Sequence, residues 1–539
     1  MNYPLIAESH PKHYLLHKYW GRKPHNIIKA YINKYSKKRE TVFDPFMGSG
    51  VTIIESLKLH RKAIGIDLNP LSYFITRVTL ENINLDNFKE HFNSIVDSSQ
   101  DIEKQIYVTK CARCKGNALI ANTIWEGEVP KRIRGLCEKC GIFLKDPDIN
   151  DKKNIKFLET NFQNLCNKYN IRNIPNENII RYVKRSGASK ITDLFSTRNV
   201  IALGILKSKI DQVKELSCRD LLNLSFSSLL PNVSSMIPGN AIKGTGRSGW
   251  VISKMYIPRI HTEKNVFLAF RQRLNTILEG KRELNLKSSD KKVKLLNISS
   301  ENIQGILKDN SVDYIFTDPP YGENIPYFGC SMLFNSWLGF CSDYSNEIIC
   351  DNYRGKNIED YKIRMSSVMK ECCRVLKPNK FMTVTFNNRD FKIWKVILES
   401  ICGNGFILNH INHHHSAVTS GTQGLNRESA IKGDFFYTFK KTKKVKPQKQ
   451  LELSLFSYKD LESYLIKLIR EVIDRKNGAT ISEIYENLIP ILVNNNMMGK
   501  CAEYLNNFDT ILSNHFILIS EKNKQTKMPE YKWGIKESF

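Results

Sequence analysis

The sequence predicts an α/β fold built on a Rossmann-like sheet that a long insertion interrupts, followed by a small winged-helix-like unit. Residues 40–84 alternate strand, glycine-rich turn, helix and strand, as at the start of a βαβ unit. The same alternation resumes near residue 293 and closes near residue 439, after roughly 200 intervening residues. We therefore expect one mostly parallel sheet made from two separated parts of the chain.

Each element of this sheet is predicted by a short apolar run between polar turns. In the first part we expect strands at 41–43 and 63–66, with a helix at 52–59 between them. In the second part, a helix should end near 375–378, and the expected strands are 293–296, 312–316, 381–386, 406–412 and 434–439. This order indicates a parallel sheet with crossover helices.

A lysine-rich linker, 440–449, separates the last segment from the sheet. Two expected helices, 481–493 and 500–513, precede two expected strands, 516–519 and 531–535. Helices followed by a two-stranded ribbon are typical of a winged helix.

The chain is strongly basic, with a formal net charge of +27 from 81 Lys and Arg against 54 Asp and Glu. A charge of this size favours a polyanionic partner, and nucleic acid is the commonest one. A basic surface kept for solubility is the alternative. The N-terminus has no apolar signal core, and no apolar run approaches the ~20 residues of a membrane helix. We expect a cytoplasmic protein with no membrane partner.

A glycine-rich turn, Asp44-Pro45-Phe46-Met47-Gly48-Ser49-Gly50, follows the first expected strand and opens the first helix. Such a turn lets the backbone approach a ligand, and the helix N-terminus offers free N–H groups. Asp67 ends the second strand, where a carboxylate can accept hydrogen bonds from ribose hydroxyls. S-adenosylmethionine (SAM) has a carboxylate and a ribose and suits this turn. The cofactor-binding candidates here are Asp44, Phe46, Gly48, Gly50 and Asp67; a turn without a cofactor is the alternative.

The tetrapeptide Asp318-Pro319-Pro320-Tyr321 follows the expected strand 312–316. An exocyclic amino group on a planar base is a poor nucleophile because its lone pair is delocalised into the ring. Asp318 and the Pro319 carbonyl are placed to accept its two N–H groups. The two prolines fix the turn, and Tyr321 offers a flat face for a flipped base. We expect these four residues to be catalytic through positioning and electrostatics. A strand-ending turn is the alternative.

Two Cys-x-x-Cys pairs, Cys111 with Cys114 and Cys137 with Cys140, are separated by 22 residues. Two thiolate pairs at this spacing suit tetrahedral Zn²⁺ in a zinc ribbon. Four protein ligands leave no open coordination position, so we expect the zinc to be structural. The expected domains are the N-terminal part of the sheet (1–104), the ribbon (105–145), a helical, target-recognition insertion (146–290), the C-terminal part of the sheet (291–440), a linker (441–457) and the winged-helix-like unit (458–539).

These motifs together resemble the adenine-specific DNA methylases that contain a zinc ribbon, over residues of about 10–440. The matching stretches are 17–24, 44–50, 65–70, the two cysteine pairs, 192–198, 317–321, Tyr327 and 332–338. The resemblance implies SAM-dependent, site-specific methylation of adenine N6 in double-stranded DNA with a flipped base, often beside a restriction or phage-defence partner. It also implies that Tyr19 and Trp20 pack over the methionine end of SAM, against the alternative of an ordinary aromatic cluster. Residues 450–539 lie outside the resemblance.

Other functions remain open at this point. The tetrapeptide alone does not separate adenine N6 from cytosine N4, although its initial Asp favours adenine. Cytosine C5 methylation needs a cysteine nucleophile, normally in a Pro-Cys dipeptide, and no Pro-Cys occurs here. An RNA base methyltransferase and a non-catalytic DNA-binding module are the remaining alternatives.

Two further segments suggest contacts with partners. The segment 239–259 interleaves basic residues with glycines and aromatics, which suits contacts with DNA phosphates and bases. The segment 450–456, Gln-Leu-Glu-Leu-Ser-Leu-Phe, resembles the short peptides that bind bacterial sliding clamps. A solvated loop and a linker packed on the C-terminal unit are the respective alternatives.

Overall fold

The computed structural model confirms a Rossmann-like sheet made from two separated parts of the chain. It describes residues 5–181, 183–184, 187–246, 254–284, 286, 292–322, 325–388, 390–414, 433–442, 458–494, 497, 508–522 and 529–536. In order across the sheet, the seven strands are β10 (Val293–Leu296), β2 (Lys62–Ile66), β1 (Thr41–Asp44), β11 (Val312–Thr317), β12 (Leu376–Phe386), β14 (Asp434–Lys441) and β13 (Phe406–His414).

The first five strands in this order run parallel, and only β14 is antiparallel to both of its neighbours. From β1 the chain moves outward to β2 on one side, whereas β11 and β12 follow on the other side. The order therefore reverses between β1 and β11, where doubly wound sheets usually bind ligands. β12 starts at Leu376, so Pro378, expected at the end of a helix, lies in the strand, where the pairing register with β11 shifts. Proline has no backbone N–H to donate to a neighbouring strand, so within a sheet it is tolerated where the regular pairing is interrupted.

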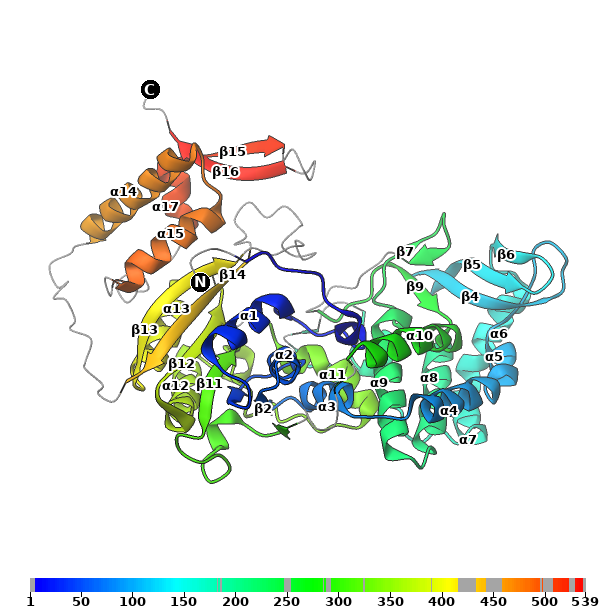
Figure 1. The fold of residues 1–539 in the computed structure, drawn as a ribbon. Helices are drawn as coiled ribbons and strands as arrows, with labels where there is room; N and C mark the ends of the chain where they lie inside the picture. The colour runs from blue at the N-terminus through cyan, green and yellow to red at the C-terminus, as the bar shows by residue number, and fades with distance from the viewer. Residues whose placement is uncertain are drawn as a thin grey trace.

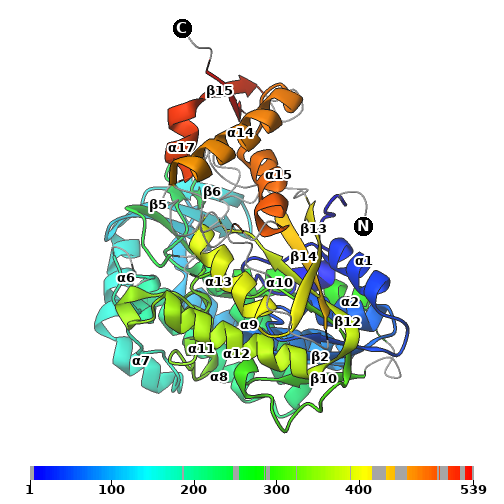
Figure 2. The same ribbon diagram turned by 90° about the vertical axis from the view of Figure 1, so that its left-hand side faces the viewer.

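Helices cover both faces of the sheet (Figures 1 and 2). Successive residues of a strand point to opposite faces. Val42 accordingly packs with α1 (His25–Tyr35) and α2 (Val51–Lys58), whereas Phe43 packs with α12 (Ile358–Val375). α13 (Phe391–Cys402) lies in the same cluster as α12.

The insertion forms a second body of helices with a small sheet beside it (Figure 1). Its helices, together with α3 (Pro70–Leu80) and α11 (Tyr327–Leu338), share one large apolar core. They are α4 (Leu85–Asp97), α5 (Gln100–Ile106), α6 (Ile149–Thr160), α7 (Phe162–Lys168), α8 (Thr197–Asp211), α9 (Leu216–Val233) and α10 (Val266–Leu284). Helices α4 and α5 come before the expected start of the insertion, yet their apolar faces pack into this core.

The small sheet contains the expected ribbon and one strand from further along the chain. Its strands are β3 (Val108–Lys110), β4 (Asn117–Glu126), β5 (Val129–Cys137), β6 (Gly141–Lys145) and β9 (Ile260–Lys264). β9 pairs antiparallel with β4, so a segment expected to be helical completes the ribbon sheet.

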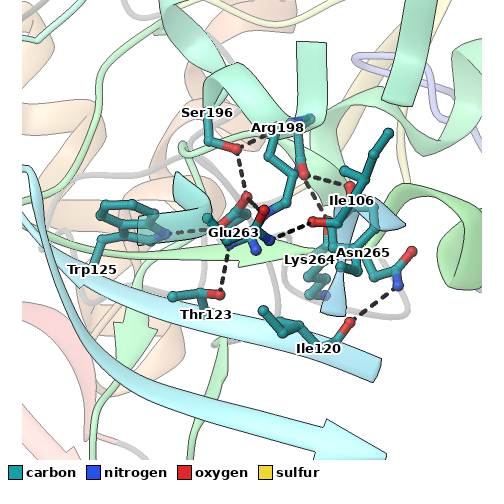
Figure 3. A network of polar contacts seen from close by, with 12 residues as sticks. Ile106, Ile120, Thr123, Trp125, Ser196, Arg198, Glu263, Lys264 and Asn265 are labelled. Atoms are coloured by element: carbon teal, nitrogen blue, oxygen red, sulfur yellow. Dashed lines mark hydrogen bonds and ion pairs between the residues drawn. The ribbon is translucent and has the colours of Figure 1, made fainter. Parts of the chain in front are cut away.

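A buried polar network joins this sheet to helix α8 (Figure 3). Arg198 donates two hydrogen bonds of 2.8 Å to the carboxylate of Glu263, and both side chains are at most 4% exposed. Ser196 and Trp125 also donate to Glu263, at 2.6 and 2.9 Å. Because loss of one partner would leave a buried charge unpaired, this network fixes the sheet against the helices.

In the C-terminal unit the structure describes α14 (Tyr458–Lys476), α15 (Ile481–Asn494), α17 (Phe508–His515) and the hairpin β15 (Phe516–Lys522) with β16 (Pro529–Ile535). Helix α14 was not expected from the sequence, whereas α15 and the two strands lie where they were expected; residues 500–507, within the second expected helix, lie outside the described ranges. Tyr485 of α15 and Phe508 of α17 pack against Phe391 at the start of α13, in an apolar cluster that also includes strands of the large sheet. The rings of Tyr485 and Phe508 contact Phe391, with centroids 5.9 and 5.6 Å away. Among the described helices, none is long and apolar enough to cross a membrane.

Candidate active site

A pocket opens at the carboxyl ends of β1 and β11, where the strand order reverses. It encloses about 940 Å³ of empty space, part of it open to solvent, which is in the range of small-molecule sites. The glycine-rich turn after β1 and Asp318 after β11 both line it. The two motifs, some 270 residues apart in sequence, therefore face one cavity.

The glycine-rich turn has a backbone that requires glycine. Gly48 and Gly50 have φ of 49° and 77°, in the left-handed region. A Cβ atom on Gly50 would lie 2.5 Å from Thr76 Cγ2, and one on Gly48 would lie 3.0 Å from Tyr19 Cε1. Gly48 and Phe46 line the pocket, whereas Gly50 caps α2 and does not. Gly50 is therefore required for the backbone conformation of the turn and does not itself face the pocket.

Asp67 closes β2 and lines the same pocket. Its Oδ2 accepts a hydrogen bond from Gly48 N and its Oδ1 one from Asn69 N, both at 2.9 Å. Burial raises the pKa of Asp67 to about 6. The Ser72 side chain also contributes a hydrogen bond, and because a carboxylate offers about four lone-pair sites, the group can still accept a ligand hydroxyl.

Asp44 lines the pocket, but its carboxylate already accepts hydrogen bonds from other groups of the protein. Its Oδ1 accepts hydrogen bonds from Phe46 N at 3.0 Å and from Thr317 Oγ1 at 2.9 Å. It therefore ties the end of β1 to the end of β11. Burial raises the pKa of Asp44 to about 7.

Tyr19 and Trp20 both line the pocket, and the Tyr19 ring lies directly beside Gly48 of the turn. The Tyr19 hydroxyl lies 2.7 Å from Ser72 Oγ, and its ring stacks on Tyr327 with centroids 6.0 Å apart. Trp20 is 5% exposed and contacts Phe334 edge-on. The expected cofactor-binding segment thus has one side facing the cavity and the other in the apolar core.

Asp318 is held through one of its two oxygens. Oδ1 accepts hydrogen bonds from the hydroxyls of Tyr321 and Thr385, the second at 2.6 Å, and Lys23 Nζ lies 3.6 Å from the same atom. Over the described ranges, no hydrogen bond to Oδ2 is seen, and Asp318 lines the cavity. Burial raises the pKa of Asp318, and the charge of Lys23 is the main influence that opposes this. Oδ2 is therefore left to accept a hydrogen bond from a substrate.

The other members of the tetrapeptide have different surroundings. Pro320 lines the pocket, whereas Pro319 and Tyr321 do not. Lys23 Nζ lies 5.0 Å above the Tyr321 ring, and the Phe386 ring meets it edge-on at 4.9 Å. One face of the ring expected to stack on a base thus carries an ammonium group.

Three residues around Asp318 were missed as site residues by sequence reasoning. Lys23 precedes α1, Thr385 lies near the end of β12, and Asp434 begins β14. Lys23 Nζ donates a hydrogen bond of 2.7 Å to Asp434 Oδ1. These side chains come from three distant parts of the sequence. Lys23 lies in the matching stretch 17–24, but no local motif indicates that the three meet at Asp318.

The four cysteines of the two pairs meet at one end of the ribbon sheet. Their Sγ atoms all lie within 4.8 Å of one another, and those of Cys114 and Cys137 are 3.6 Å apart. A tetrahedral zinc site with Zn–S bonds of about 2.3 Å places its sulfurs about 3.8 Å apart. Cys111 Sγ also accepts a hydrogen bond from Arg113 N. The donor set and its spacing therefore fit Zn²⁺.

The two segments suggested as partner contacts are described in part or not at all. Within 239–259, the short strands β7 (Gly239–Asn240) and β8 (Thr245–Gly246) pair beside the ribbon, and residues 247–253 lie outside the described ranges. Arg259 is exposed but pairs with Glu126 at 3.0 Å. The clamp-like segment 450–456 lies outside the described residues.

Comparison with known proteins gave one family and several distant relatives. Residues 4–75 and 312–532, over half of the chain, match the family model N6_N4_Mtase, described as DNA methylase. The match runs to residue 532, which corrects the expectation that residues 450–539 lie outside the resemblance. The type II methyltransferase M.MjaII of Methanocaldococcus jannaschii is 23% identical over 91 residues, which are 17% of either chain. The match thus spans about one sixth of that relative.

Solved structures resemble the chain only weakly. TrmN from Thermus thermophilus gives a TM-score of 0.17 at 13% identity, with 32% of this chain and 34% of that chain covered. A SAM-dependent methyltransferase from Methanosarcina mazei gives 0.18 at 12% identity, covering 32% and 78%. Scores this low support no assignment, whereas the family match covers both parts of the sheet and both motifs of the pocket. On that match, this chain belongs to the N6/N4 DNA methylase family.

Proposed function

We propose that this protein is a SAM-dependent, site-specific DNA methyltransferase that methylates the N6 amino group of adenine in duplex DNA. The observation that carries the proposal is the shared pocket, which is lined by the glycine-rich turn, by Asp67 and by Asp318, whose Oδ2 accepts no hydrogen bond from the residues that the structure describes. A cofactor held by the turn and an amino group held by Asp318 would meet in this space.

The residues present fit SAM as the cofactor, which supplies an electrophilic methyl group when bound. Gly48 brings the backbone close to the cavity, and the N-terminus of α2 nearby favours a carboxylate. Asp67 is an acceptor for ribose hydroxyls. Tyr19 and Trp20 line the pocket beside the turn, where their rings would exclude water from the cofactor.

At the other end of the pocket, the chain acts on the amino nitrogen. Asp318 Oδ2 would accept one N–H of the base, which would draw the nitrogen lone pair out of conjugation. The second acceptor expected from the sequence, the Pro319 carbonyl, belongs to a residue that does not line the cavity, so its role remains a prediction. The nitrogen would gain the methyl group as the C–S bond between that group and the cofactor breaks, and it would lose one proton to solvent. This is catalysis by positioning and electrostatics, with no covalent intermediate on the protein.

The ribbon is proposed to hold one structural Zn²⁺ through Cys111, Cys114, Cys137 and Cys140. The four thiols lie at the required spacing, and no open coordination position would remain. Metal analysis of protein purified without chelator should find one zinc per chain, and Cys111→Ser should lower this ratio. Protein that is folded and free of zinc would contradict the proposal.

Two alternatives follow from the same pocket. Cytosine N4 carries an equivalent amino group, and the family includes both N6 and N4 in its name. RNA is the second substrate class, because a basic chain would also bind it. We favour duplex DNA, since the family match is to DNA methylases. A restriction or defence partner, and a sliding clamp bound by 450–456, remain predictions.

The test uses purified full-length protein with methyl-labelled SAM and equal amounts of duplex DNA and tRNA. We expect label in DNA, recovered as N6-methyladenine after digestion to nucleosides. Label recovered as N4-methylcytosine, or in tRNA alone, would replace the proposal with the corresponding alternative. Binding of SAM without label in either substrate would favour a non-catalytic DNA-binding module.

A further inference from the structure

Lys23 is the one ammonium group seen near Asp318 in the described part of the chain, and it sits between two carboxylates. Its Nζ lies 2.7 Å from Asp434 Oδ1 and 3.6 Å from Asp318 Oδ1, and its side chain is 10% exposed. The same Nζ lies above the Tyr321 ring. Lysine is almost never buried to this degree without paired charges, so the two aspartates account for its position.

The contacts divide the roles of the two aspartates. Asp434 makes the short hydrogen bond and anchors the ammonium. Asp318 is further away, and its Oδ1 is already filled by the hydroxyls of Tyr321 and Thr385. Lys23 therefore acts on Asp318 mainly as a charge.

We infer that Lys23, anchored by Asp434, is a positioning residue that keeps Asp318 ionised with Oδ2 turned to the pocket. The inference deepens the proposed function and rests on it, because an ionised Oδ2 is the acceptor that the amino group requires. Desolvation in this half-buried site favours the protonated carboxyl group, and a protonated Oδ2 would donate where it must accept.

The charges around Asp318 have opposite effects on its pKa. Burial raises the pKa, Lys23 is the first influence that lowers it, and Asp434 raises it. The charged and titratable groups that face Asp318 are Lys23, Asp434, Asp44, Tyr321 and Tyr327. Replacing Lys23 and replacing Asp434 should therefore move the Asp318 pKa in opposite directions.

The experiment measures kcat/KM for methyl transfer to duplex DNA against pH, whose acidic limb reports the ionisation of the essential base. In Lys23→Met the limb should move up by about one pH unit or more, as expected for loss of an opposite charge within ~4–6 Å. In Asp434→Asn it should move down, and in Lys23→Arg it should stay near its wild-type position.

Lys145→Met is the matched control. The Lys145 side chain is 11% exposed and also pairs with two carboxylates, Asp148 and Asp151, at 2.6 and 2.7 Å, but it lies on β6 in the ribbon. The acidic limb of the kcat/KM profile of Lys145→Met should coincide with that of the wild type. The inference would be overturned if the acidic limb of the kcat/KM profile did not move in Lys23→Met. It would also be overturned if the limb moved in the same direction in Lys23→Met and Asp434→Asn.

A second readout separates this inference from the proposed function. Carboxyl ¹³C NMR of protein labelled at aspartate, with Asp318→Asn to assign the signal, follows the ionisation of Asp318 without any substrate. In this NMR titration the pKa of Asp318 should again rise in Lys23→Met and fall in Asp434→Asn. If they appear while no DNA is methylated, the inference about Lys23 stands and the proposed function fails. If they are absent in folded variants, the inference fails whatever the activity.

Discussion

The two ends of the pocket hold their carboxylates by different means. Asp67 is held by backbone N–H groups of Gly48 and Asn69, within its own βαβ unit. Asp318 is held by side chains, those of Tyr321, Thr385 and Lys23, which come from well-separated segments. The cofactor end thus depends on the local backbone, whereas the catalytic end depends on the assembled sheet. Substitutions should affect binding at one end and turnover at the other.

The largest expected effect is that of Asp318→Ala. Removing the acceptor at the catalytic end should lower kcat by about 10²–10³-fold, as for loss of one oriented group in such a site. The affinity for SAM should change little because the turn and Asp67 are untouched. Single-turnover methylation and calorimetric titration of SAM measure the two quantities. Substantial methylation by the variant would remove Asp318 from the mechanism.

The converse substitution is Asp67→Ala. Loss of a charged acceptor is worth about 1.5–3 kcal/mol, so the Kd for SAM should rise by roughly ten- to a hundredfold. At saturating SAM, methyl transfer should approach the wild-type rate. An unchanged Kd by calorimetry would show that Asp67 only supports the turn. A large loss of kcat at saturation would break the separation between the two ends.

A smaller effect is expected for Thr385→Val, which keeps the size of the side chain but removes one donor to Asp318 Oδ1. The loss of one hydrogen bond to a charged group predicts a decrease in kcat of about tenfold, with the SAM affinity unchanged. Thr383→Val is a control on the same strand, since Thr383 is fully buried and bonds Tyr314 and Thr438 away from the pocket. Equal losses of kcat in both variants would point to a general defect of β12.

The smallest effect is a pH dependence of SAM binding without DNA. Burial raises the pKa of Asp67 to about 6, so the carboxylate is an acceptor above that pH and loses its charge below it. Affinity should therefore fall as the pH decreases through about 6. Asp44, with a pKa raised to about 7, also titrates in the pocket. Asp67→Asn should remove the step near pH 6, and a step that persists in this variant would assign it to Asp44.

The cofactor end could be predicted from the sequence because its parts are contiguous. The strand, the glycine-rich turn and Asp67 lie within one βαβ unit, so periodicity and glycine placement locate them. At the catalytic end, only the tetrapeptide is local. Asp434 could have been found from topology, since an antiparallel last strand begins at the edge where the parallel strands end. Lys23 lies in the matching stretch 17–24, but nothing there indicates its pairing with Asp434, 411 residues away.

In the insertion, too, local features could be predicted from the sequence and distant pairings could not. The Cys-x-x-Cys spacing is local and located the ribbon. The pairing of β9 with β4 joins residues more than a hundred positions apart, and nothing in the sequence of 260–264 marks it as a partner of 122–126. The packing of α4 and α5 with the insertion likewise depends on which apolar faces meet, which a single sequence does not give.

The most direct test of the account is single-molecule sequencing of genomic DNA from cells that express the wild-type protein or Asp318→Ala at equal levels. The account predicts N6-methyladenine at one recurrent sequence motif in the wild-type sample and none at that motif in the variant sample. Identical methylation in the two samples would contradict it. A recurrent N4-methylcytosine signal would keep the chemistry at Asp318 but contradict the assignment to adenine.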